Sequence, residues 1–134
     1  MARYALESFL ENARNGGVTH LGYAKRLDSA QVQAAVGKAA VDIKLIEAFQ
    51  HWMLSGRDDG DPQLLLATAT GCFRLAREAI EALYEVAPSS VIALGDPLQR
   101  LLRDVRAFEH QHVFSTFIGH ELYGRVACAE AAAG

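Results

Sequence analysis

Cysteine is scarce in this sequence: Cys72 and Cys128 are the only two, they lie far apart, and neither belongs to a CxxC motif. This excludes a disulfide scaffold and a zinc site built on cysteines, and it fits a reducing compartment. No stretch approaches the roughly 18 consecutive apolar residues of a membrane-spanning helix. Glu7 and Glu11 stand where a signal peptide would have its apolar segment. We therefore expect a cytoplasmic protein with no membrane partner.

The sequence also has no excess of positive charge. The chain has 13 Lys and Arg against 16 Asp and Glu, for a net charge of −3 and a pI of about 5.9. A nucleic-acid partner normally requires a basic surface, so none is expected. The chain has 134 residues, of which 51% are hydrophobic. It is long enough to bury a core, and we expect a single domain over residues 1–134.

Proline is rare, and its positions mark helix starts. Two of the three prolines follow an aspartate, in Asp61-Pro62 and Asp96-Pro97. Aspartate at the N-cap followed by proline at the first helical position is a strong start signal, because proline lacks an N–H that would have no partner there. Apolar residues recur at helical spacing after both signals, and no segment alternates as a strand would.

The predicted fold is all-α. Helices are expected over residues 2 to about 14, 28 or 29 to 54, 62 to about 86, and from 97 onward. Asn15-Gly16-Gly17 is expected to end the first helix, and residues 55–60 to form the turn after the second. The last helix either continues or bends around residues 109–112. Long helices with short links predict an antiparallel, up-down four-helix bundle.

Three segments resemble a known family. Residues 97–104 read PLQRLLRD, His110 follows, and residues 122–125 read LYGR. Together with Arg77 and the segment LDSAQVQ at residues 27–33, they are similar to the C-terminal helical domain of the acyl-CoA dehydrogenase fold. The sequence looks most like the branch of reduced-flavin-dependent, two-component monooxygenases. The resemblance extends over nearly the whole chain.

The resemblance implies a cofactor and partners. Family members also carry an N-terminal helical domain and a middle β-domain, which cannot fit in 134 residues. Flavin lies between the β-domain and the C-terminal bundle, so FAD or FMN is expected together with a partner subunit that carries the missing domains. The resemblance also implies a homo-oligomer, either a dimer or a tetramer, and a small-molecule substrate.

The resemblance further assigns candidate site residues. His110 is the first candidate for a catalytic histidine facing the flavin and His112 is the second, since histidine exchanges protons near neutral pH. Arg103 and Asp104 are expected near the flavin, and Arg77 is a candidate phosphate contact. The alternative from the residues themselves is a solvated face with ion pairs four residues apart, such as Arg77 with Glu81, and ordinary surface histidines.

A metal site is not expected. Glu109 and His112 have the i,i+3 spacing found in di-iron bundles, but such a site needs two of these motifs and further glutamates, and this chain has one. Glu47 and His51, which also share a helix face, supply no second motif. Cys72 falls on an apolar stripe and is predicted to act as a small buried residue.

Two functions remain open. The first is a stand-alone domain or small subunit of a flavin-dependent oxidoreductase or monooxygenase, which completes a flavin or substrate site on assembly. The alternative is a non-catalytic, oligomeric helical-bundle protein for binding or assembly that has lost flavin chemistry.

Overall fold

The computed structural model describes residues 1–14, 16, 22–56, 61–111 and 114–134, and these form five α-helices. The helices are α1 (Ala2–Ala13), α2 (Ala30–Leu54), α3 (Pro62–Glu85), α4 (Pro97–Glu109) and α5 (Thr116–Ala133). Two short 3₁₀ helices, η2 (Arg26–Asp28) and η3 (Ser89–Ile92), lie in the connections. No strand forms within these ranges, so the predicted all-α class is confirmed.

The two aspartate-proline signals start helices as predicted. The side chain of Asp61 accepts hydrogen bonds from the backbone N–H groups of the second and third residues of α3, at 2.9 and 3.1 Å. Asp96 does the same for α4, at 2.8 and 3.4 Å. Each carboxylate satisfies N–H groups that have no partner within the helix and lies at its positive end.

The predicted fourth helix is divided in two. α4 ends at Glu109 and α5 begins at Thr116, so the described part of the chain forms five helices. Of the two alternatives left open by the sequence, a last helix that continues or one that bends around residues 109–112, the second agrees with this division. The expected end of the first helix at residues 15–17 and the expected turn at 55–60 lie partly outside the described residues, and His112 lies outside them entirely.

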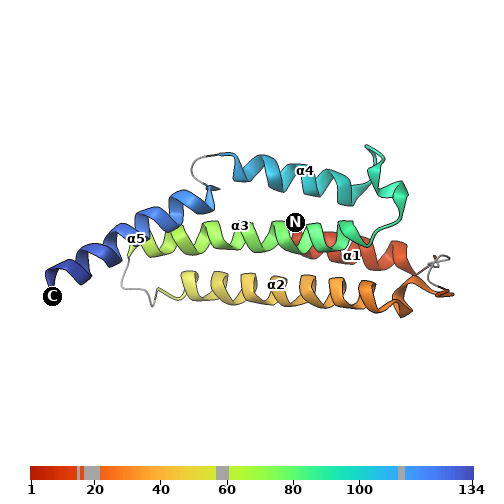
Figure 1. Cartoon of the computed structure of the whole chain (residues 1–134), viewed down its shortest axis with the longest axis horizontal. Helices are drawn as coiled ribbons and strands as arrows, with labels where there is room; N and C mark the ends of the chain where they lie inside the picture. The colour runs from red at the N-terminus through yellow and green to blue at the C-terminus, as the bar shows by residue number, and fades with distance from the viewer. Residues whose placement is uncertain (15, 17–21, 57–60, 112–113) are drawn as a thin grey trace.

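α3 is the central helix, since it contacts each of the other four (Figure 1). The chain reverses direction between α2 and α3 and again between α3 and α4. α1 is half as long as α2 and begins beside the middle of α3, so it accompanies only one half of the α2–α3 pair. α5 packs on the other half of α3 and extends past the end of the pair (Figure 1).

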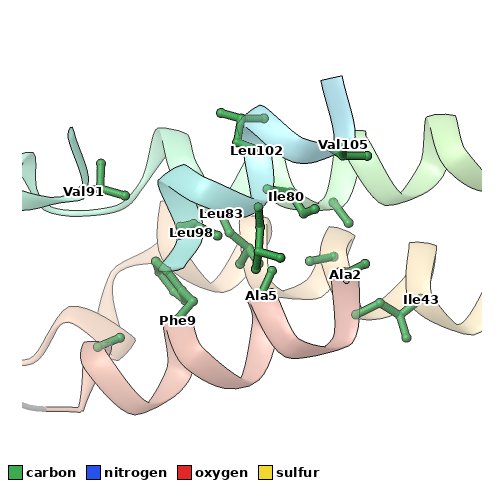
Figure 2. Packing of buried hydrophobic residues seen from close by; sticks show 14 of the residues in the cluster. Ala2, Ala5, Phe9, Ile43, Ile80, Leu83, Val91, Leu98, Leu102 and Val105 are labelled. Atoms are coloured by element: carbon green, nitrogen blue, oxygen red, sulfur yellow. The ribbon is translucent and has the colours of Figure 1, made fainter. Parts of the chain in front are cut away.

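The buried core lies where α1 packs against the other helices. Figure 2 shows Ala5 and Phe9 of α1 packed against Leu83 of α3 and the start of α4. The other core residues of α3 and α4 continue this cluster: Ala79, Ile80, Leu98, Leu101, Leu102 and Val105. Between Lys44 and Glu78, no apolar residue in the described part is buried. The core therefore occupies one half of the molecule.

Candidate functional site

A network of four charged side chains joins α3 to α4. Arg77 donates from Nε to Glu109 at 3.0 Å and from Nη1 to Glu81 at 2.6 Å. Glu81 also accepts from Nε and Nη2 of Arg106, at 3.2 and 2.9 Å. Two arginines thus alternate with two glutamates across the helix pair, and the charges within this network cancel.

The surroundings of Arg77 keep it cationic. Burial by itself lowers the pKa of Arg77, but the hydrogen bond and negative charge of Glu109, together with those of Glu81, outweigh burial and raise it. The predicted ion pair with Glu81 is confirmed. Arg77 already holds two carboxylates, so any bound phosphate would have to share this guanidinium with them.

A hollow of ≈ 540 Å³ lies beside this network, between α3 and α4. Arg103 borders the hollow and has no ion-pair partner among the residues described. The side-chain oxygen of Gln99 is buried without a hydrogen bond within the same part of the chain. The lining residues are Glu81, Tyr84, Glu85, Gln99, Leu102, Arg103 and Arg106. Arg103 is exposed and can reach a ligand in the hollow, whereas the oxygen of Gln99 is buried beneath its lining.

Arg103 and Asp104 have different surroundings on α4. Successive residues of a helix point about 100° apart, so the two side chains leave α4 on different flanks. Asp104 faces Arg100 at 4.0 Å and does not line the hollow, whereas Arg103 does. Of the two, only Arg103 lies with the charged network.

His110 lies on the same flank as Arg103. The two are seven positions apart, which on a helix means nearly the same direction and about 11 Å of rise. His110 is the residue that closes the C-terminal end of α4, and it is exposed. The structure therefore brings Arg103 and His110 to one surface and separates Asp104 from them.

The other acidic and basic candidates are engaged elsewhere. Glu109 binds Arg77, and Glu47 is paired with Arg3 and with Lys44. No group of three or more metal-ligating side chains occurs in the part of the chain that the structure describes. Arg74 and Glu78, four residues apart on α3, also form an ion pair, at 2.6 Å.

Cys72 is half-buried, and desolvation raises the pKa of its thiol. It lines a second hollow of ≈ 300 Å³ at the start of α1, whose wall is mostly apolar and whose rim carries the pair between Arg3 and Glu47. A raised pKa favours the protonated form of the thiol. The sequence predicted a buried Cys72, and the structure places it half-buried in the wall of this hollow.

Sequence reasoning missed Glu109 as a partner of Arg77, Arg106 as a second partner of Glu81, and the buried oxygen of Gln99. The i,i+4 rule finds pairs within one helix. The contacts missed here cross from α3 to α4, and no spacing within the sequence encodes them.

Comparison with known proteins relates most of the chain to one family. The family model for the acyl-CoA dehydrogenase C-terminal domain matches residues 1–116. Among solved structures, XiaF from Streptomyces sp. in complex with FADH2 and glycerol matches with a TM-score of 0.80 and 22% identity. The match covers 92% of this chain and 34% of XiaF, so the chain spans about a third of that protein. No curated protein sequence matches the chain. No helix in the described ranges is long and apolar enough to span a membrane.

Proposed function

Because the chain belongs to the acyl-CoA dehydrogenase C-terminal domain family, we propose that it is the helical-bundle part of a flavin-dependent oxidoreductase. In this proposal it contributes one wall of a flavin or substrate site, and a partner subunit that carries a β-domain supplies the other. The reaction class is that of a reduced-flavin monooxygenase. The observation that carries the proposal is the fold shared with XiaF, whose structure holds FADH2.

The chain's own residues fit one wall of such a site. A guanidinium with no partner in the described structure can hold a phosphate or another anionic group through two parallel hydrogen bonds, and Arg103 provides one beside the hollow. His110 lies exposed on the same flank, where it can take up or release a proton near neutral pH. When bound, the flavin would supply the redox chemistry.

The remaining candidate residues have less direct roles in this proposal. Asp104 lies on the far flank of α4 with Arg100, which leaves it a role in contacts between subunits. Arg77 would contact an anion only in competition with Glu81 and Glu109, which already pair with its guanidinium. His112 remains the second proposed catalytic histidine, and FAD and FMN both remain candidates.

The test is flavin binding with a matched pair of variants. Oxidised and reduced FMN and FAD are titrated into the chain, alone and with its partner subunit, and binding is followed by flavin fluorescence and calorimetry. Arg103→Gln should weaken binding about tenfold or more, since a charge-assisted hydrogen bond contributes ~1.5–3 kcal/mol. Arg125→Gln removes the same charge from α5, which does not line the hollow, and should leave binding unchanged.

His110→Ala is a second variant that tests the same proposal. An exposed position should leave the free energy of unfolding within about 1 kcal/mol, while flavin-dependent turnover of the complex is lost. Unchanged turnover would transfer the role to His112. If neither flavin binds in either oxidation state, with or without the partner, the proposal fails and the alternative of a non-catalytic assembly bundle takes its place.

A further inference from the structure

The charges that join α3 to α4 are followed by two charges that do not meet. Arg77, Glu81 and Glu85 are spaced by one turn of α3, so they lie on one side of the helix. The first two pair with α4, as described above. Glu85 and Arg103 come next along the two antiparallel helices (Figure 1), and both line the ≈ 540 Å³ hollow. Neither forms an ion pair with a residue that the structure describes, so the hollow separates two opposite charges.

Glu85 stands where a carboxylate has little support from its own helix. It is the last residue of α3, whose last turn has no basic residue. The C-terminal end of a helix carries partial negative charge and favours cations. Arg26 of η2 does reach this end, but it donates to the carbonyl of Val86 at 3.1 Å and forms no ion pair with Glu85. Glu85 is exposed, so a cationic group that enters the hollow can bind it.

The rest of the hollow adds no net charge and offers an apolar surface. Glu81 and Arg106 also line it, and they pair with each other at 2.9 Å. Leu102 is buried in the lining and Tyr84 is half-buried there, so an aliphatic side chain and an aromatic ring face a ligand together. Aromatic rings pack favourably against one another. The volume of ≈ 540 Å³ falls in the range of small-molecule sites, which is ~300–1,000 Å³.

We propose that the hollow binds a free aromatic amino acid, with its carboxylate on Arg103 and its ammonium group on Glu85. A guanidinium binds a carboxylate through two parallel hydrogen bonds, and an ammonium group donates to a carboxylate. An α-amino acid carries both charges on one carbon atom, and its ring extends away from them to the apolar surface of Tyr84 and Leu102. The zwitterion thus takes the place of the ion pair that Glu85 and Arg103 do not form.

This inference goes beyond the proposed function and requires neither flavin nor a partner subunit. It meets that function at one residue, because a flavin held by Arg103 would occupy the same hollow. An amino acid on Arg103 should therefore compete with such a flavin, and L-phenylalanine should raise the apparent dissociation constant of the flavin. Binding at the hollow would then be regulated by the concentration of an amino acid.

The first test is isothermal titration calorimetry of the chain alone with three probes. L-Phenylalanine carries both charges, 3-phenylpropionate lacks the ammonium group, and 2-phenylethylamine lacks the carboxylate. Each of the last two loses one charge-assisted contact, so each should bind about tenfold or more weakly than L-phenylalanine. The ring is common to all three probes, so the comparison isolates the two charges.

The second test assigns each charge to its residue. Arg103→Gln should weaken the binding of L-phenylalanine about tenfold or more and leave that of 2-phenylethylamine unchanged. Glu85→Gln should weaken the binding of L-phenylalanine by a similar factor and leave that of 3-phenylpropionate unchanged. Arg125→Gln and Glu130→Gln are the matched controls, since both side chains are exposed on α5 and neither lines the hollow. Neither control should change any of the three affinities, and circular dichroism of each variant separates loss of binding from loss of fold.

Three results of these titrations would overturn the proposal: no saturable binding of L-phenylalanine, equal affinities for the three probes, or an unchanged affinity for L-phenylalanine in Arg103→Gln or Glu85→Gln. A double-mutant cycle of unfolding without ligand supplies a fourth, because coupling between Glu85 and Arg103 would show that the two charges already pair. Flavin titration of the same samples reports on the proposed function separately. A chain that binds L-phenylalanine but no flavin keeps this inference and loses the proposed function, and the reverse result does the opposite.

Discussion

Arg77 is the residue through which α3 and α4 are electrostatically joined. Its guanidinium binds Glu81 on its own helix and Glu109 on the next, and the three side chains are only 27%, 25% and 22% exposed. Ion pairs in water contribute little, whereas removing one member of a shielded group leaves the others without compensation. The contribution of Arg77 should therefore exceed that of a surface pair.

We expect Arg77→Met to lower the free energy of unfolding by about 1–2 kcal/mol, between the exposed and fully buried limits. The methionine keeps most of the side-chain volume but leaves Glu109 without an ion-pair partner in the described structure. Arg125→Met is the control, because it breaks a pair with Glu121 in which the side chains are 71% and 42% exposed. It should cost less than about 0.5 kcal/mol in urea unfolding. Equal losses for the two variants would contradict this account.

α5 is attached to α3 by an unusually close approach. Gly119 is the only buried residue of α5 in the described structure. A Cβ added there would lie 2.3 Å from Oγ1 of Thr70 and 3.2 Å from Cα of Ala67. Thr70 is buried and its hydroxyl donates to the carbonyl of Ala67, so it has no room to move aside.

Gly119→Ala should therefore destabilise the docking of α5 by about 1–3 kcal/mol, as overpacking does elsewhere. Gly124→Ala lies on the same helix with nothing within 4 Å of the new methyl group. There the better helix propensity of alanine should stabilise the chain by up to about 1 kcal/mol. Thermal unfolding followed by circular dichroism measures both. The same sign for the two substitutions would show that α5 is not seated by Gly119.

The helix starts were predictable, whereas for the fourth helix the sequence left open whether it continues or bends around residues 109–112. Asp61 and Asp96 act on backbone groups two and three residues away, so the sequence alone contains the signal. The division of the fourth helix depends on how α5 seats against α3, a contact between residues far apart in the chain. The same difference applies to the candidate site. The ion pair Arg77–Glu81 lies within one helix and could be predicted from the sequence, whereas Arg77–Glu109 joins two helices and could not.

At the scale of the whole molecule, the buried core lies in one half of the structure. The buried cluster lies where α1 packs against α3 and α4, while the other half of the α2–α3 pair carries apolar residues that are only partly covered. Neither fact follows from helical periodicity, because the periodicity of α2 does not say which of its apolar faces will meet a neighbour.

Native-state hydrogen exchange should reveal this asymmetry. Amides of α1, α4 and the last turns of α3 should exchange only on global unfolding, because they surround the core. Amides of α5 and the last turns of α2 should exchange through local opening at lower free energy. Uniform protection over all five helices would contradict it.

The close approach of Gly119 in α5 to Thr70 in α3 also has a genetic consequence. Every glycine codon becomes an alanine codon by a change of its second base, so a single point mutation reaches the methyl group that the contact with Thr70 has no space for. The placement of an 18-residue helix thus depends on one nucleotide of the coding sequence. At the same helix's Gly124, the equivalent mutation meets open space. Inherited variation should therefore be tolerated at one of these codons and removed by selection at the other.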